Sequence, residues 1–305
     1  MDIINNSAFL SSTNTATMYG ASNSCPLIKV STPLCDAIIS YQGAQLLEFT
    51  PKSKDKESEP SWIWLSPKAI FSEGKAIRGG IPICAPWFGV NQQNPQKPKH
   101  GLVRTQQWIL KGIIESEDGT VALSFQYTST ASDLLLYPHR FQLDLKITLS
   151  DQVKMSLTAY NLSDSNMPFS WAFHNYFCVD NLQDVHVSGL DEHRYLDAAK
   201  RDNAGNFSVK NQQGDIYFKG EVDSVYEGTS EQQTIIGTPA IKIEGNNCPT
   251  TIVWNPGAEL AKNMTDVGIE HYKKYICVER GAAFNDSWNI APGCSKSATM
   301  LLTER

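Results

Sequence analysis

The chain has 305 residues, of which 41% are hydrophobic and 19% charged, and its 32 acidic and 26 basic residues give a net charge of −6. A chain this apolar can bury a sizeable core, which excludes intrinsic disorder. The acidic balance argues against nucleic acid as the main partner, because a protein that binds a duplex needs a net basic face. It does not exclude an anionic small molecule, since one or two placed arginines can bind a phosphate.

Cysteine usage and the N-terminal sequence bear on the compartment. The seven cysteines are an odd number, lie scattered along the chain and form no C-x-x-C pair, so neither a disulfide framework nor a zinc site is indicated. No apolar run approaches the roughly 20 residues that span a bilayer. Residues 1–21 are polar and carry one charge, Asp2, unlike a secretory signal peptide. We therefore expect a cytoplasmic protein with no membrane partner.

The elements predicted along the chain are mostly strands. Residues 51–60, rich in Lys, Asp, Glu and Ser, are predicted as a solvated loop, and a short helix is a candidate at 67–71. Residues 121–127, 141–150 and 153–160 alternate apolar and polar side chains, which is typical of strands with one face on a core. The two-residue turn between the last two predicts a hairpin.

The second half of the chain continues this pattern in shorter pieces. Less strictly alternating apolar segments lie at 171–177, 235–237, 241–244, 251–254 and 275–279. Helical periodicity is scarce, and the remaining helix candidate is 258–264. Many strands with frequent turns and little helix predict an all-β sandwich or barrel. No repeat or clean linker divides the chain, so a single domain is the better interpretation.

Two glycine-rich segments break the strand pattern. The first, Arg78 to Gly89, reads RGGIPICAPWFG, where paired glycines let another group approach the backbone and Arg78 is placed to reach an anion. The second, Lys97 to Arg104, carries His100 and Arg104 in one loop, where together they could hold a phosphate and a sugar oxygen. Each segment taken alone is more typical of a solvated surface turn.

Two strand-like segments contain ionisable residues among apolar ones. His174 lies in SWAFHNYF, where a histidine is either a satisfied core residue or a general acid near neutral pH. Glu279 ends the apolar run YICVE, where partial burial would raise its pKa enough for it to act as a base near neutrality. The alternative for Glu279 is a salt bridge with Arg280 at the end of a strand.

Taken together and in order, these segments carry a family resemblance. The sequence resembles the hexose-6-phosphate mutarotase branch of the aldose 1-epimerase (galactose mutarotase-like) superfamily. The matching text is RGGIPICAPWFG from Arg78, KHGLVR from Lys99 with Trp108, FHNYF from Phe173, TIVWNPG from Thr251, KNMTD from Lys262 and CVE from Cys277. It departs at the basic Arg280 and in the segment after Gly281, where loop contacts are left open.

The resemblance implies an all-β supersandwich, with two large twisted antiparallel sheets, few short helices and an active site in a concave cleft. It implies one mutarotase-like domain over 31–305. Residues 1–30 have no counterpart and are expected to be a poorly ordered tail. It also implies interconversion of the α and β anomers of a hexose 6-phosphate, with glucose 6-phosphate the natural first substrate, by a monomer that needs no cofactor and no metal.

The resemblance further assigns roles to individual residues. His174 matches the general acid that protonates the ring oxygen, and Glu279 matches the general base that removes the proton of the anomeric hydroxyl. His100 and Asp223 match residues that hydrogen-bond the sugar. Arg78 and Arg104 are the candidates for the phosphate, since a guanidinium can form two parallel hydrogen bonds to it.

Two other functions remain open at this point. A mutarotase for free aldoses would keep His174 and Glu279 but would have no use for a phosphate clamp. A non-catalytic carbohydrate-binding protein on the same sandwich would keep the aromatic side chains and the cleft, because a fold does not fix a function.

Overall fold

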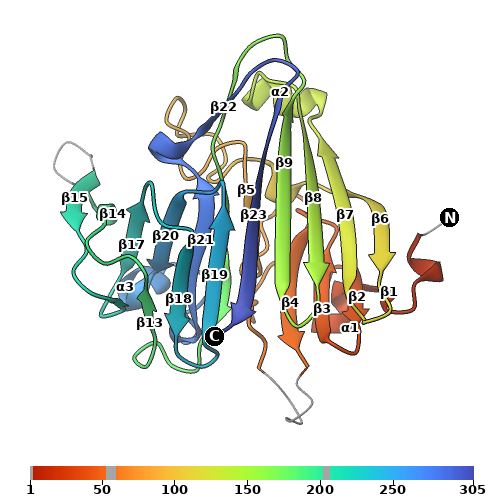
Figure 1. Ribbon diagram of the computed structural model, residues 1–305, viewed down its shortest axis with the longest axis horizontal. Coiled ribbons are helices and arrows are strands. Elements are labelled where there is room, and N and C mark those ends of the chain that lie inside the picture. The colour runs from red at the N-terminus through yellow and green to blue at the C-terminus, as the bar shows by residue number, and fades with distance from the viewer. Residues whose placement is uncertain (1–2, 53–59, 202–206) are drawn as a thin grey trace.

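In a computed structural model, residues 3–52, 60–201 and 207–305 are described, and within them the chain folds into antiparallel sheets (Figure 1). The largest sheet has nine strands, which pair in the order β16 (Ile216–Tyr217), β13 (His186–Ser188), β18 (Gln232–Ile236), β19 (Ile241–Asn246), β23 (Ser295–Glu304), β9 (Val153–Asn161), β8 (Phe141–Leu149), β7 (Val121–Thr128) and β6 (Ile109–Glu115).

The second large sheet has eight strands and carries the site described below. Its order is β15 (Phe207–Asn211), β14 (Arg194–Arg201), β17 (Val222–Tyr226), β20 (Thr250–Asn255), β21 (Tyr275–Ala282), β11 (Trp171–Phe173) and β5 (Ile83–Cys84), with β12 (Tyr176–Cys178) also pairing with β21. Two smaller sheets consist of β1 (Leu10–Asn14), β2 (Pro26–Ser31), β3 (Cys35–Ser40) and β4 (Gln45–Pro51), and of β10 (Met167–Phe169) and β22 (Trp288–Ile290).

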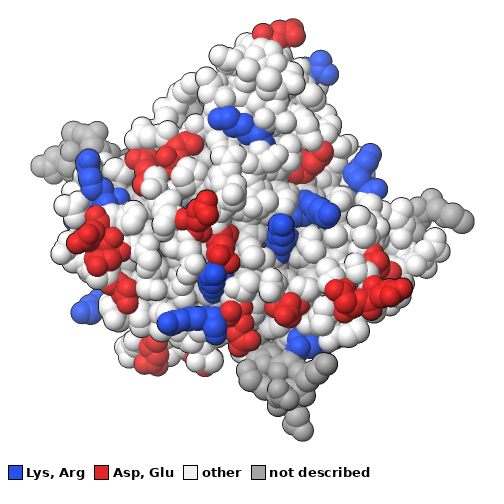
Figure 2. All heavy atoms as spheres, viewed as in Figure 1, with Lys and Arg blue, Asp and Glu red and all other residues white. Residues whose placement is uncertain are grey.

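Helices are few and short. The α-helices of the described residues are α1 (Thr15–Tyr19), α2 (Ala131–Leu136) and α3 (Gly257–Ala261), and the 3-10 turns are η1 (Ile3–Asn6), η2 (Val103–Thr105), η3 (Tyr272–Lys274) and η4 (Phe284–Asp286). Among the residues described, no helix is long and apolar enough to cross a membrane. On the face drawn in Figure 2, acidic and basic side chains are interspersed.

The strictly alternating segments form strands where they are predicted. β7, β8 and β9 are neighbours in the nine-stranded sheet, and β8 and β9 form the hairpin, with Leu149 opposite Val153. Every second residue of β8 is buried. The shorter predictions are also confirmed as β18, β19, β20 and β21. The alternation succeeded here because one face of each strand packs on a core.

Other predictions are corrected by the structure. Residues 67–71 form a turn and extended chain, in which the bond from Ala69 N to Ser66 O closes one turn that is not propagated. Such a short helix has too few hydrogen bonds to offset the cost of nucleation. The helix expected at 258–264 is α3, which ends at Ala261. The strand expected over 171–177 is two strands, interrupted at His174 and Asn175. Of the loop predicted at 51–60, residues 53–59 lie outside the described residues.

The N-terminal segment is not the poorly ordered tail that was expected for residues 1–30. From Ile3 onward it forms η1, β1, α1 and most of β2, and β1 pairs with β2 over its full length. Ile4 and Leu10 are buried against the main core. These elements are short and polar, so their stability comes from pairing within the four-stranded sheet rather than from a periodic pattern.

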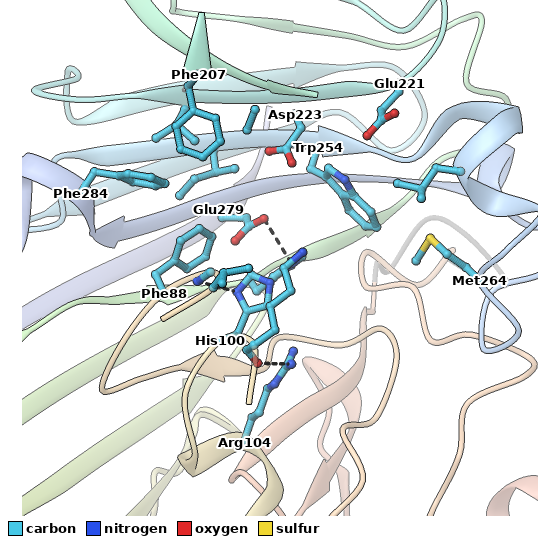
Figure 3. Close-up of a pocket in the computed structure, with 18 of the residues that line it drawn as sticks. Phe88, His100, Arg104, Phe207, Glu221, Asp223, Trp254, Met264, Glu279 and Phe284 are labelled. Atoms are coloured by element: carbon cyan, nitrogen blue, oxygen red, sulfur yellow. Dashed lines mark hydrogen bonds and ion pairs between the residues drawn. The ribbon is translucent and has the colours of Figure 1, made fainter. Parts of the chain in front are cut away.

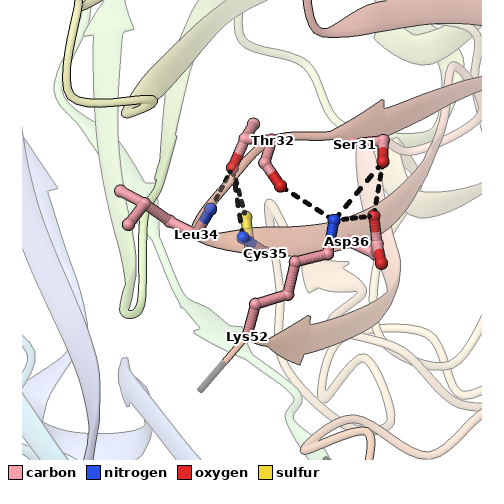
Figure 4. Close-up of polar contacts among 6 residues, drawn as sticks. All are labelled: Ser31, Thr32, Leu34, Cys35, Asp36 and Lys52. Carbon is pink, nitrogen blue, oxygen red and sulfur yellow. Dashed lines mark hydrogen bonds and ion pairs between the residues drawn. The ribbon is translucent and has the colours of Figure 1, made fainter. Parts of the chain in front are cut away.

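The turn between β2 and β3 shows how this sheet is held (Figure 4). Thr32 Oγ1 accepts hydrogen bonds from the backbone N–H groups of Leu34 and Cys35. Lys52 Nζ lies 2.7 Å from Asp36 Oδ1 and donates to Thr32 O. Burial raises the pKa of the Cys35 thiol to about 11, so this cysteine acts as a small apolar side chain.

The main core is shared by the three larger sheets. One contiguous cluster includes Phe125 and Leu145 from the nine-stranded sheet, Phe173 and Val278 from the eight-stranded sheet, and Phe49 from the four-stranded sheet. Because successive residues of a strand point to opposite faces, the neighbours of Phe173 and Val278 lie on the other face of the eight-stranded sheet. That face is where the ionisable residues singled out in the sequence occur.

Candidate active site

His174 and Glu279 lie directly opposite each other on two neighbouring strands. Phe173 pairs with Arg280 in β11, and Tyr176 pairs with Cys277 in β12. These two pairs have the same register, so the two residues between them also lie opposite β21: His174 is opposite Glu279, and Asn175 is opposite Val278. The interruption at His174 and Asn175 thus breaks the backbone ladder without shifting it.

The side chain of Asn175 replaces the missing ladder bond. Its Nδ2 donates a hydrogen bond of 2.9 Å to Val278 O, the carbonyl next to Glu279 in the chain, and it is fully buried. The backbone N–H of His174 instead donates to Pro82 O. The His174 ring stacks on Tyr176, with centroids 4.7 Å apart and planes 6° from parallel. The positions of both His174 and Glu279 are therefore fixed by neighbouring side chains, Tyr176 and Asn175 respectively.

The pair is buried and incompletely hydrogen-bonded. His174 Nε2 lies 3.3 Å from Glu279 Oε1, while His174 Nδ1 and Glu279 Oε2 have no partner among the described residues. Burial, with the neighbouring Asp223, raises the pKa of Glu279 well above its usual range. Burial, with the positive charges of Arg104, Arg78 and Lys99, holds the pKa of His174 well below its usual range. Both shifts favour the neutral forms of the two side chains, a protonated carboxyl group and an uncharged imidazole.

A cavity of about 410 Å³ opens onto this pair. Alternate residues of the eight-stranded sheet form its floor, because Glu279 is opposite Ile252 and Ile252 is opposite Val225 in the register. Asp223 and Trp254, which pair with each other two residues along the strands from Val225 and Ile252, also line it. In Figure 3 Glu279 lies between Phe88 and Phe284 on one side and Trp254 and Met264 on the other.

The loop before η2 brings His100 to the cavity. Gly101 has φ +76°, and a side chain there would meet Ala85 O at 1.9 Å, so only glycine permits this close approach. His100 Nδ1 accepts a hydrogen bond from Gly89 N, which leaves Nε2–H as the donor of the neutral ring. Burial and the nearby positive charge of Arg104 keep the pKa of His100 well below its usual range. The ring lies 5.4 Å from that of His174.

Three cationic residues line the cavity, but they differ in how far they are already engaged. Arg78 Nε donates to Asp266 Oδ2 and Arg78 Nη1 donates to Tyr176 Oη, each at 2.9 Å. Arg104 Nη2 donates to Lys99 O, which fixes the loop and uses one of its nitrogens (Figure 3). Lys99 is exposed at the cavity. Arg104 thus retains one more N–H donor for an anion than Arg78 does.

All six residues singled out in the sequence line this one cavity: Arg78, His100, Arg104, His174, Asp223 and Glu279. The sequence reasoning assigned no role to Lys99, Glu221, Trp254 or the phenylalanines that complete the wall. Trp254 lies within the quoted TIVWNPG text, and its position two residues from Ile252 on one face of a strand is the signal that could have found it. Within the described residues no group of three or more His, Cys, Asp or Glu side chains could hold a metal ion.

Comparisons with known proteins show the family of the chain. The profile of the aldose 1-epimerase family matches residues 26–303. A protein of Cenchrus ciliaris named "Putative glucose-6-phosphate 1-epimerase" is 36% identical over 273 residues, covering 85% of this chain and 78% of the relative. A protein of Escherichia coli K12 with the same name is 32% identical, covering 84% of this chain and 83% of the relative.

The fold of a solved structure matches that of this chain over almost its whole length. The crystal structure of a "putative mutarotase" from Salmonella typhimurium superposes with a TM-score of 0.80 at 28% identity, covering 92% of this chain and 91% of the other. The expected all-β fold of the galactose mutarotase type is thereby confirmed. On the match of the profile to residues 26–303 and on the relatives at 32% and 36% identity, the chain belongs to the aldose 1-epimerase family.

Proposed function

We propose that the protein interconverts the α and β anomers of a hexose 6-phosphate, with glucose 6-phosphate as the first candidate. The observation that carries the proposal is the buried His174–Glu279 pair, 3.3 Å apart at the floor of a cavity that Arg104 and Lys99 also line. The names of the relatives from Cenchrus ciliaris and Escherichia coli support the same substrate.

The pair suits the proton balance of this reaction. Ring opening removes a proton from the anomeric hydroxyl O1 and adds one to the ring oxygen O5, which breaks the C1–O5 bond. Glu279 takes the first proton and His174 gives the second, and rotation about C1–C2 precedes closure by the reverse transfers. The pair holds one proton at every stage, and each positioned group contributes about 10²–10⁴-fold.

The environment of the pair sets where that proton lies. Burial favours protonated Glu279 and neutral His174, which is the state left after ring opening. A bound phosphate brings negative charge toward Arg104 and Lys99, offsetting the field that lowers the pKa of His174. The substrate thereby favours the imidazolium that ring opening requires, but it does not favour the carboxylate, because the same cations also lower the pKa of Glu279; the carboxylate forms when Glu279 passes its proton to His174.

The rest of the cavity positions the sugar. His100 Nε2–H and Asp223 bind ring hydroxyls. Arg104 and Lys99 bind the phosphate, and Arg78, which already donates hydrogen bonds to Asp266 and Tyr176, is a third cation in the cavity. We further propose that the enzyme acts as a monomer in the cytoplasm. Its seven cysteines, all within the described residues, are free, which fits a reducing compartment.

Exchange NMR of glucose 6-phosphate and of glucose tests the proposal directly. We expect the wild-type protein to accelerate anomerisation of the phosphorylated sugar and His174→Ala to abolish this. Arg104→Ala should raise KM for the phosphorylated sugar by about tenfold, the loss of roughly one charge-assisted hydrogen bond, with little effect on free glucose. Equal rates for both sugars in the wild type would indicate a free-aldose epimerase, and no acceleration of either would indicate a binding protein.

A further inference from the structure

Phe284 adopts a backbone conformation that is rare for an aromatic residue. Its φ is +55°, in the left-handed region where a side chain is strained and where glycine is usual. It is the first residue of η4, two residues after the end of β21 and five residues after Glu279. Strained residues of this kind cluster at functional sites when the surrounding structure fixes them.

Hydrogen bonds on both sides of Phe284 fix this conformation. Asn285 donates from its backbone N and its Nδ2 to the two carboxylate oxygens of Glu227. Asp286 Oδ2 accepts from Gly228 N and Thr250 Oγ1. Together these contacts tie η4 to the turn that follows β17 and to β20. Because these hydrogen bonds fix the turn on both sides, the backbone at Phe284 cannot relax and the strain is retained.

The fixed turn directs the Phe284 ring into the cavity. Its centroid lies 6.1 Å from that of Phe88 and 6.1 Å from that of Phe207, both edge to face (Figure 3). Phe88 in turn packs edge-on against His100 at 4.8 Å. Phe284 and Phe88 are only half-buried, so their rings retain surface that a ligand can cover.

This aromatic wall adjoins the reacting pair. Phe284 and Phe88 pack on a small apolar cluster of Ala172, Val225 and Ile252, and Ile252 is the residue opposite Glu279 in the register. A sugar ring over Glu279 is therefore within reach of an apolar surface on one side and of the cations Arg104 and Lys99 elsewhere in the cavity.

We propose that Phe284, with Phe88, forms a specificity subsite that packs on the C–H face of the hexose ring and selects hexose 6-phosphates whose hydroxyls at C2, C3 and C4 are all equatorial, whichever anomer is bound. The inference rests on the proposed function and deepens it. An equatorial hydroxyl leaves the ring faces to C–H groups, which an aromatic ring covers well. An axial hydroxyl on the covered face would point at carbon and lose its hydrogen bonds to water.

Two substitutions separate the ring from the strain. Phe284→Ala and Phe284→Gly both remove the ring, but only glycine relieves the left-handed backbone. We expect both to raise KM for glucose 6-phosphate equally, by about 2- to 10-fold, as the loss of one aromatic contact. We expect Phe284→Gly to unfold about 1–3 °C higher than Phe284→Ala. A purely structural role predicts instead that KM follows stability, so that the glycine variant recovers activity.

Comparison of epimers tests the selectivity. In the wild type, KM for glucose 6-phosphate should be lower than for mannose or galactose 6-phosphate, which carry an axial hydroxyl at C2 or C4. In both variants the difference should shrink, while the affinity for inorganic phosphate, measured by calorimetry, stays unchanged. An unchanged preference among the three sugars in the variants would overturn the inference. If the wild type accelerates none of them, the proposed function fails, and calorimetry with the same three sugars still decides whether Phe284 selects among them.

Discussion

Glu279 and Arg280 are adjacent residues of β21 that lie on opposite faces of the eight-stranded sheet, and each is only 1% exposed. Glu279 faces the cavity, 3.3 Å from His174, and its second oxygen has no partner among the described residues. Arg280 enters the core, where its Nη1 donates to oxygens of Gln233, Thr251, Thr229 and Ser230, while its Nε has no partner among the described residues. Two buried ionisable groups, one residue apart, thus have contrasting surroundings.

The contrast indicates different roles for the two residues: Arg280 stabilises the fold, whereas Glu279 is available for chemistry. A charge inside a core must be hydrogen-bonded by the protein, because nothing else can reach it. Neutral acceptors surround Arg280, and Gly245 leaves it room, since a side chain at that glycine would lie 2.6 Å from Arg280 Nε. At Glu279 the missing partner faces a cavity, so the lone pairs are available to a ligand. The strand-end salt bridge between these two residues, open as an alternative in the sequence, is not formed: their side chains lie on opposite faces.

The largest effect is expected for Glu279→Gln. The amide keeps the shape of the side chain but cannot take the proton from O1, so kcat should fall by about 10²–10⁴-fold. The unfolding temperature should not fall, because the substituted group makes no hydrogen bond that the fold needs. Exchange NMR and thermal unfolding on one preparation measure both. Retention of wild-type kcat would remove Glu279 from the mechanism.

Arg280→Ala should show the opposite behaviour. The substitution leaves a cavity and strands the acceptors of Gln233 and Thr251, so the free energy of unfolding should fall by about 3 kcal/mol. Activity per folded molecule should be largely kept. Urea unfolding, with Arg280→Lys as the milder control, measures the loss. If Arg280→Ala keeps its stability but loses kcat as Glu279→Gln does, the two residues do not have separate structural and catalytic roles.

Sequence reasoning succeeded where a local pattern carries the information. Strict alternation located β7, β8 and β9, and the six residues singled out in the sequence all line one cavity. It failed where stability is non-local: β1 and β2 contain no strong pattern, and pairing defines them. The break at His174 and Asn175 does not follow from the pattern of residues 171–177, because it depends on an amide side chain replacing a backbone bond. The strain at Phe284 likewise follows from hydrogen bonds that join Asn285 and Asp286 to Glu227, Gly228 and Thr250, which are remote from them in sequence.

The amide side chain of Asn175 gives the next prediction. Asn175→Ala removes the hydrogen bond to Val278 O and should loosen the spacing of His174 and Glu279. We expect kcat to fall by about tenfold, since small misplacement of catalytic groups is costly, with KM nearly unchanged. A merely structural role would lower stability without moving the pH profile of kcat. A shifted profile in Asn175→Ala, compared with the wild type at equal folded concentration, is the expected result.

The smallest expected effect is on the pH dependence of stability, and it isolates Glu279. Its pKa in the folded chain is raised well above its usual range, so over neutral pH the folded chain holds a proton that the unfolded chain has released. The unfolding free energy therefore falls as pH rises, and stability is greatest below the unfolded pKa of about 4.3.

Urea unfolding of the wild type and of Glu279→Gln from pH 5 to pH 8 measures this contribution. His174 contributes with the opposite sign, because its lowered pKa means that stability is lost as pH falls below about 6.5, but it is present in both proteins. The stability of Glu279→Gln relative to the wild type should therefore increase steadily with pH. A constant difference would mean that Glu279 is already ionised in the folded, ligand-free protein, and the neutral pair would then have to be replaced by an imidazolium and a carboxylate poised before the sugar binds.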